Sequence, residues 1–136
     1  MKNLKKYFLN ENPVRYYLDV NKERDTIIKE NNNRAIVYQW YCKTTEKIYV
    51  GSALNGHRRL TTYWIPSILK ENKLRIYQSI NEYGHDNHYL AILEDIGNSK
   101  EVDKDYLISR EQYYLDILFE KDKDYVINVF KKARTK

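Results

Sequence analysis

The sequence predicts an α+β domain with a small, three-stranded, mainly antiparallel sheet flanked by helices. Two runs rich in β-branched and aromatic residues, 35–41 and 47–51, are separated by a short polar segment, as in a β-hairpin. Helical and extended segments then follow without regular alternation, which favours an antiparallel sheet over repeated βαβ units. At 136 residues, the chain is long enough for one such core.

The first 34 residues are polar and interrupted, and we expect them to form an arm before the main domain. Pro13, a charged run at 22–24 and three asparagines at 31–33 break this segment, so that only 25–30 favours a short helix. We therefore divide the chain into a basic and polar N-terminal arm (1–34), a domain (35–133) and a basic tail (134–136).

Two helices are predicted after the hairpin. Asn55 is suited to cap a helix that carries two adjacent arginines, because its side chain can accept a hydrogen bond from the first turn. In 74–83, apolar residues recur at helical spacing, and Gly84 follows where a C-cap glycine belongs. A third strand at 89–96, a helix at 106–119 and an extended segment at 125–130 complete the domain.

The last predicted helix has a carboxylate, Glu111, within its apolar stripe. Burial of a carboxylate is costly unless a cation or a hydrogen-bond donor meets it. An ion pair with Arg110 or a lysine, together with partial exposure, is the plainer explanation. A metal ion is the alternative.

Composition limits the partners. The chain has 24 Lys and Arg against 19 Asp and Glu, a formal charge of +5, which favours phosphate-bearing partners. A lone cysteine, Cys42, excludes an internal disulfide and a cysteine-based zinc site, and it favours a reducing compartment or an intracellular lumen. No apolar run approaches the length of a bilayer span, and no secretory signal is recognised, so we expect no membrane among the partners.

The segment from Ala35 to Ala133 resembles the GIY-YIG nuclease domain, in particular the endonucleases encoded in introns of fungal mitochondrial genomes. The residues that carry the resemblance occur in the order of the family's motifs: Ile36-Val37-Tyr38, Tyr49-Val50-Gly51, Arg59, Tyr63, Glu111 and Asn128. The chain departs from the first motif at Ile36, where the family has glycine. Strand backbone accepts isoleucine, so this change removes no catalytic group.

The resemblance implies a catalytic role for six residues: Tyr38, Tyr49, Arg59, Tyr63, Glu111 and Asn128. Glu111 would hold one divalent cation, Mg²⁺ or a similar ion, and no small-molecule cofactor is expected. Arg59 would bind the phosphate and offset the charge of the transition state. Tyr49 would shape and polarise the phosphate site.

Tyr38 would act as the general base for the attacking water, or would orient that water. A phenol with a pKa of about 10 is a poor base near neutral pH, so the base role requires Arg59 and the metal ion to lower this pKa. Tyr63, where many relatives have histidine, would share the proton transfer or support Tyr38. Without the resemblance, Tyr38 and Tyr49 would be interpreted as ordinary strand tyrosines.

Three residues are predicted to contact nucleic acid: Arg58, Lys47 and His57. Arg58 competes with Arg59 for the catalytic role, and the motif spacing favours Arg59. His57, His85 and His88 have no spacing for a shared metal site.

The sequence therefore predicts a mitochondrial, metal-dependent DNA endonuclease of the homing type. Homing relatives continue into a DNA-binding region, whereas this sequence ends soon after the core, so we expect targeting to depend on the arm or on a partner. The alternative is an endonuclease-derived component of an organellar ribonucleoprotein, such as the mitochondrial ribosome, that binds ribosomal RNA. A catalytically silent protein-interaction domain is a third hypothesis.

Overall fold

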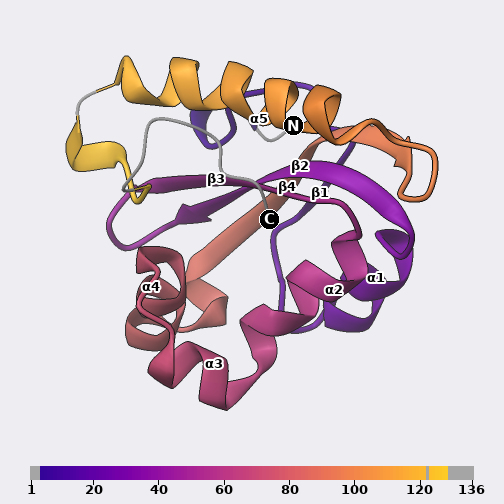
Figure 1. Cartoon of the computed structure of the whole chain (residues 1–136). Helices are drawn as coiled ribbons and strands as arrows, with labels where there is room; N and C mark the ends of the chain where they lie inside the picture. Colours follow the sequence, from indigo (N-terminus) through magenta and orange to yellow (C-terminus); the bar gives the residue numbers. More distant parts are fainter. Residues whose placement is uncertain (1–3, 122, 129–136) are drawn as a thin grey trace.

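A computed structural model describes residues 4–121 and 123–128, which form a sheet between two layers of helices (Figure 1). The strands are β1 (Arg15–Tyr17), β2 (Arg34–Cys42), β3 (Ile48–Ala53) and β4 (His88–Asn98). The helices are α1 (Arg24–Glu30), α2 (Gly56–Thr61), α3 (Pro66–Glu71), α4 (Arg75–Tyr83) and α5 (Lys104–Phe119). Short 3₁₀ turns occur at η1 (Leu4–Lys6), η2 (Thr62–Trp64), η3 (His85–Asn87) and η4 (Lys123–Tyr125).

The α+β fold class is confirmed, but the prediction of three strands is wrong, because the sheet has four strands in the order β1-β4-β2-β3. All neighbours pair antiparallel. The additional strand, β1, comes from the segment predicted to be an arm, and it pairs with 90–92 of β4. A three-residue strand has no period to detect in the sequence, and backbone hydrogen bonds to the free edge of β4 hold it in place.

The predicted hairpin, the third strand and the predicted helices are confirmed with small shifts of their ends. The Asn55 side chain accepts a hydrogen bond from the His57 backbone N–H, and this begins α2. Gly84 is the C-cap of α4. In the closing segment, Tyr125 ends the η4 turn and Val126 forms an isolated parallel bridge with Ile48. Residues 129 and 130 of that segment and the basic tail lie outside the described residues.

The two faces of the sheet bury different cores. One face packs against α1–α4 and contains most of the buried aromatic rings of the described residues, among them those of Tyr38, Trp40 and Tyr63, which are all fully buried. The other face lies under α5 (Figure 1) and is covered by its apolar stripe, Leu107, Tyr114, Leu115 and Leu118. Consecutive residues of a strand point to opposite faces, so β2 and β3 supply side chains to both cores.

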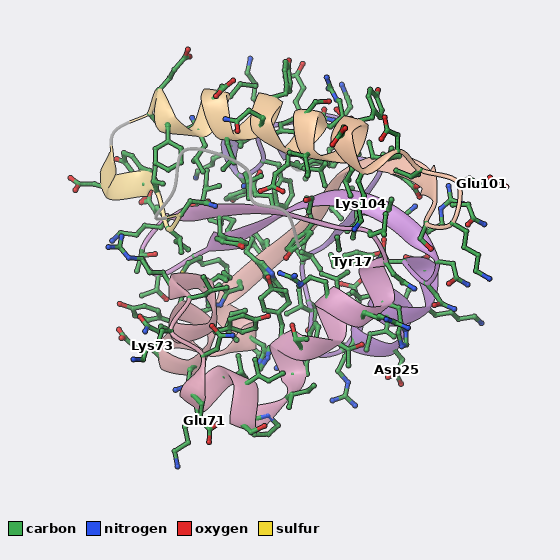
Figure 2. The ribbon with its side chains drawn as sticks, in the orientation of Figure 1. Tyr17, Asp25, Glu71, Lys73, Glu101 and Lys104 are labelled. Atoms are coloured by element: carbon green, nitrogen blue, oxygen red, sulfur yellow. The ribbon has the colours of Figure 1, made fainter. Side chains whose placement is uncertain are left out.

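Charged side chains surround these cores. Figure 2 shows Asp25, Lys73, Glu101 and Lys104 at the outside of the molecule, and each of them is exposed. Among the described residues, no helix combines the length and the apolar character needed to cross a bilayer. Strand β3 is an edge of the sheet, and the candidate site lies along it.

Candidate active site

Tyr38 and Tyr49 lie on the same face of the hairpin formed by β2 and β3. Their ring centroids are 6.4 Å apart, and the hydroxyl oxygens of Tyr38 and Tyr63 are hydrogen-bonded at 2.7 Å. Tyr63 reaches this point from the η2 turn, 25 residues after Tyr38. The structure therefore brings together the three tyrosines that the resemblance selects.

Gly51 allows this close packing. It pairs with Tyr38 across the hairpin, and a Cβ atom added to Gly51 would lie 2.8 Å from the Tyr38 hydroxyl oxygen and 3.0 Å from Cε2 of Tyr49. The Tyr38 ring is fully buried and has little freedom to move away. A side chain at position 51 is therefore incompatible with the observed position of the Tyr38 hydroxyl group.

Arg59 extends from α2 toward the tyrosines. The nearby phenol oxygens, that of Tyr38 first, raise the pKa of its guanidinium above the usual value, although burial acts in the opposite direction. Arg59 is half-buried, whereas the adjacent Arg58 and His57 are exposed. Of the two adjacent arginines, Arg59 is the one that lies near the tyrosines.

The phenol groups are poor bases in this environment. Burial raises the pKa of Tyr38 and that of Tyr63 well above the ordinary value, and the Arg59 charge only partly offsets this for Tyr38. Burial also raises the pKa of Tyr49 to about 12. At neutral pH the Tyr38 hydroxyl group is therefore protonated and hydrogen-bonded, which suits it to orienting a neighbour better than to removing a proton.

Glu111 lies in α5, and its side chain is buried against β3. Only 3% of the residue is exposed, and its carboxylate accepts a hydrogen bond from the Ser52 hydroxyl group. The Glu111 charge also contributes to the raised pKa of Tyr49. Ser52 and Tyr49 belong to the same edge strand but point to opposite faces. Glu111 therefore lies on one side of β3, and the tyrosines lie on the other.

The plainer explanation of Glu111 is wrong about its exposure and about Arg110. Glu111 is not partly exposed, and Arg110 instead forms a two-point contact with Glu94, with Arg110 Nε 2.8 Å from a Glu94 oxygen. Tyr114 donates a further hydrogen bond to Glu94 at 2.8 Å.

A divalent cation fits the donor chemistry at Glu111. Among the described residues, no group of three His, Cys, Asp or Glu side chains is arranged to enclose a metal ion. Mg²⁺ does not require such a cage, since proteins commonly hold it through one or two carboxylates, and water and substrate phosphate complete its shell. Glu111 is the carboxylate that would hold the ion here.

Asn128 fastens the end of the described chain to the edge strand. Its side-chain amide donates to the Val50 carbonyl oxygen at 2.9 Å and accepts from the Val50 N–H at 2.8 Å. Asn128 thereby satisfies the backbone N–H and carbonyl groups of Val50, the residue after Tyr49. This geometry supports a role in positioning the strand that carries Tyr49 more directly than a role in contacting the substrate. Lys47 is exposed in the hairpin turn, at the opposite end of β3 from Arg59.

Two residues near the site are not distinguished by any pattern in the sequence. The Tyr77 ring stacks on Tyr63 with centroids 4.8 Å apart, and its hydroxyl group is hydrogen-bonded to Thr62 at 2.6 Å. Ser52 is the donor to Glu111. Both resemble many other core residues in the sequence, and only their neighbours in space distinguish them.

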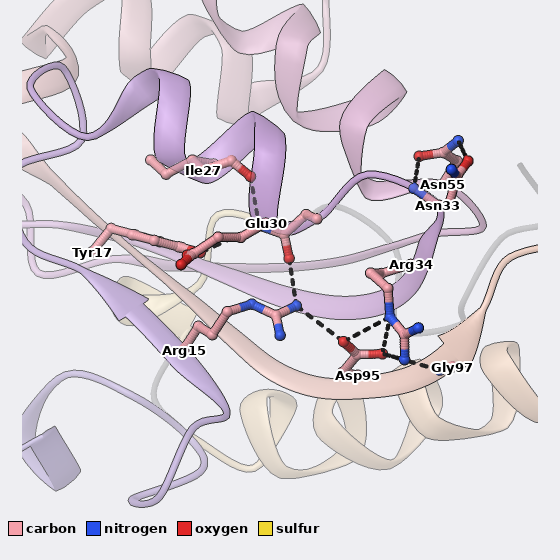
Figure 3. A network of polar contacts seen from close by, with 10 residues as sticks. Arg15, Tyr17, Ile27, Glu30, Asn33, Arg34, Asn55, Asp95 and Gly97 are labelled. Atoms are coloured by element: carbon pink, nitrogen blue, oxygen red, sulfur yellow. Dashed lines mark hydrogen bonds and ion pairs between the residues drawn. The ribbon is translucent and has the colours of Figure 1, made fainter.

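A polar network next to α2 also could not be predicted from any pattern in the sequence (Figure 3). Asp95 binds Arg34 through two oxygens and binds Arg15 at 3.1 Å. Arg15 also donates to the side-chain oxygen of the fully buried Asn31 at 2.7 Å. The Asn31 backbone oxygen in turn accepts from the His57 N–H at 3.1 Å, so the network reaches the start of the helix that carries Arg59.

An arginine, several tyrosines and a buried carboxylate lie around the edge strand β3 of this α+β domain. Such a set of side chains is suited to acting on a phosphodiester. The family model for the GIY-YIG catalytic domain matches residues 34–122. This span is more than half of the chain, and the protein therefore belongs to the GIY-YIG catalytic domain family.

Solved structures show the same relationship. One similar structure is a mutant of the catalytic domain of intron endonuclease I-TevI, with 23% identity, a TM-score of 0.57 and coverage of 75% of this chain and 99% of that chain. Another is the catalytic domain of homing endonuclease I-TevI, with 26% identity, a TM-score of 0.51 and coverage of 69% and 98% respectively. Strand β1 precedes the span matched by the family model.

Proposed function

We propose that this protein is a divalent-metal-dependent endonuclease that hydrolyses phosphodiester bonds in DNA. Membership of a nuclease family supports the reaction class. The single observation that carries the proposal is the placement of Glu111 and Tyr49 at the same edge strand: the Glu111 carboxylate accepts a hydrogen bond from Ser52 of β3, and Tyr49 lies three positions earlier in that strand. The charges of Arg59 and Glu111 both act on Tyr49, so the site offers one group for a phosphate and one for a metal ion.

The roles of the residues follow from this arrangement. Glu111 would hold the ion, which supplies positive charge to the phosphate when it is bound. Arg59 would bind the same phosphate with its planar guanidinium and stabilise the charge that develops on it. Tyr38, held by its hydrogen bond to Tyr63, would orient the attacking water and would not act as its base, since the raised pKa values of both phenols disfavour ionisation.

The test is cleavage of plasmid DNA with Mg²⁺ by the wild-type protein and by Glu111→Gln. We expect the variant to lose at least a hundredfold in rate, because it cannot hold the ion by charge. The matched control is Glu120→Gln, an exposed carboxylate at the end of the same helix, which should cleave like wild type. Equal nicking by wild type and Glu111→Gln would refute the proposal.

We extend the proposal to a homing type of activity in mitochondria. It is supported by the similarity to structures described as intron and homing endonucleases and by the resemblance of the motifs to fungal mitochondrial intron-encoded enzymes. Recovery of the protein in purified mitochondria, with cleavage confined to one or a few sites in organellar DNA, is the expected result. Salt-resistant co-sedimentation with ribosomal particles, without cleavage, would instead support the ribonucleoprotein alternative.

A further inference from the structure

A basic hollow opens beside Arg59, with a cavity volume of about 550 Å³. Three segments that are far apart in the sequence form its walls: the start of α2, the loop before β2 and the turn after β4. The polar residues of its lining are Asn33, Asn55, Arg58, Arg59, Ser99 and Lys100.

The charge of the hollow is positive, with cations on two of its three walls. Three cations line it, and none of the described residues in the lining is acidic. Arg58 and Lys100 are exposed, and Arg59 is half-buried. Within the described part of the chain, none of these three cations forms an ion pair with a carboxylate. Cations that face one concave surface without acidic neighbours attract an anionic ligand.

Hydrogen bonds between the walls hold the hollow in shape. The Ser99 N–H donates to the Asn33 carbonyl oxygen at 2.9 Å, and the Asn33 N–H donates to the Asn55 side-chain oxygen at 3.1 Å. The same Asn55 oxygen accepts from the His57 N–H at 3.1 Å. The three walls are thus connected before any ligand binds, and little ordering is needed on binding.

We propose that this hollow binds the sugar–phosphate backbone of the nucleic acid next to the phosphate at Arg59, with Arg58 and Lys100 as phosphate contacts. The inference rests on the proposed nuclease function, because Arg59 belongs to both the hollow and the candidate active site. A backbone that continues from the phosphate at Arg59 reaches the two further cations. No aromatic ring of the described residues lines the hollow, so the contacts hold phosphate and do not read bases.

Lys100→Gln tests the proposal, because Lys100 lies on an exposed turn outside the group of tyrosines. Binding of the full chain to two duplex DNAs of unrelated sequence is measured over a range of salt concentrations in EDTA, which prevents metal-dependent cleavage. We expect weaker binding to both duplexes by the same factor, and a slope of log K against log salt that is shallower by about 0.9. Lys100→Arg should restore the wild-type slope.

The matched control is Lys73→Gln, which removes the same charge from an exposed site before α4 (Figure 2). An unchanged slope for Lys100→Gln, or an equal change for Lys73→Gln, would overturn the proposal, and the first result would favour an acidic protein partner for the hollow. The binding measurement does not depend on catalysis. A shallower slope in a protein that never cleaves DNA would support the hollow and refute only the nuclease function.

Discussion

The span 34–122, matched by the family model, and the segment before it, 4–33, contribute differently to the same site. The matched span supplies Tyr38, Tyr49, Arg59 and Glu111. The preceding segment supplies β1 and Asn31, which hold the sheet and the start of α2 from behind. The groups proposed for chemistry and the contacts that position them thus come from different parts of the chain, and mutations can separate the two.

Arg59→Ala tests the matched span and has the largest expected effect. Removal of a donor that stabilises transition-state charge costs about 10²–10³ in rate, whereas the loss of a half-exposed side chain changes stability little. The measurement is single-turnover cleavage of plasmid DNA, together with thermal unfolding. Arg75→Ala, at an exposed position in α4, serves as the control, and a similar loss of rate in both variants would contradict the assignment.

Gly56→Ala tests the contact between the two regions. An added Cβ would lie 2.8 Å from the Asn31 backbone oxygen and 2.9 Å from Cδ1 of Ile36, so α2 must shift. We expect a loss of about 3 kcal/mol of stability, the upper part of the range for overpacking, and a loss of cleavage rate per folded molecule because α2 carries Arg59.

Gly84→Ala provides the contrast for this variant. Gly84 has a φ of 84° and no atom within 4 Å of an added Cβ, so alanine there introduces backbone strain of about 1–2 kcal/mol without a clash. Urea unfolding should show destabilisation of both variants, and cleavage should decrease only for Gly56→Ala. Normal cleavage by folded Gly56→Ala would show that the contact does not position Arg59.

Arg15→Met tests the segment 4–33. Its guanidinium contacts both Asp95 and the buried Asn31, and loss of these hydrogen bonds in a partly buried site should cost about 2 kcal/mol. Arg24→Met, which removes an exposed ion pair with Asp25, should cost about 0.5 kcal/mol or less. The free energy of unfolding in urea distinguishes them, and a lower cleavage rate at full saturation in folded Arg15→Met would show that this segment does more than stabilise.

The dependence of stability on pH is the smallest expected effect. Burial raises the pKa of the Asp95 carboxyl group, but hydrogen bonds from Arg34 and Arg15 lower it by more, so the net pKa in the folded protein is below its ordinary value. The stabilisation by this carboxylate is therefore complete above the unfolded pKa, about 4, and is lost as the pH falls through the folded pKa.

Asp95→Asn should accordingly be less stable than wild type at neutral pH, and its stability should decrease less below about pH 4. Urea unfolding at several pH values measures this, with Asp25→Asn, an exposed carboxylate, as the control. Parallel profiles for wild type and Asp95→Asn would show that Asp95 does not couple folding to pH.

The sequence alone determined the local features of this protein. The hairpin, the Asn55 cap, the Gly84 cap and the apolar stripe of α5 depend on residues a few positions apart, and short-range patterns record them. The order and spacing of the family motifs likewise selected Tyr38, Tyr49, Arg59 and Glu111. In the structure, Tyr49 lies in the edge strand β3 and Tyr38 in its neighbour β2, while Arg59 and Glu111 are supplied by α2 and α5.

Only the tertiary structure decided the fourth strand, the contact of Glu111 with Ser52 and the raised pKa of Tyr38. Strand β1 is three residues long and forms because β4 offers a free edge. Ser52 and Glu111 are 59 residues apart, and no pattern in either segment predicts their contact. The pKa of Tyr38 depends mainly on complete burial by distant segments, because a charged phenolate is unfavourable where water is excluded.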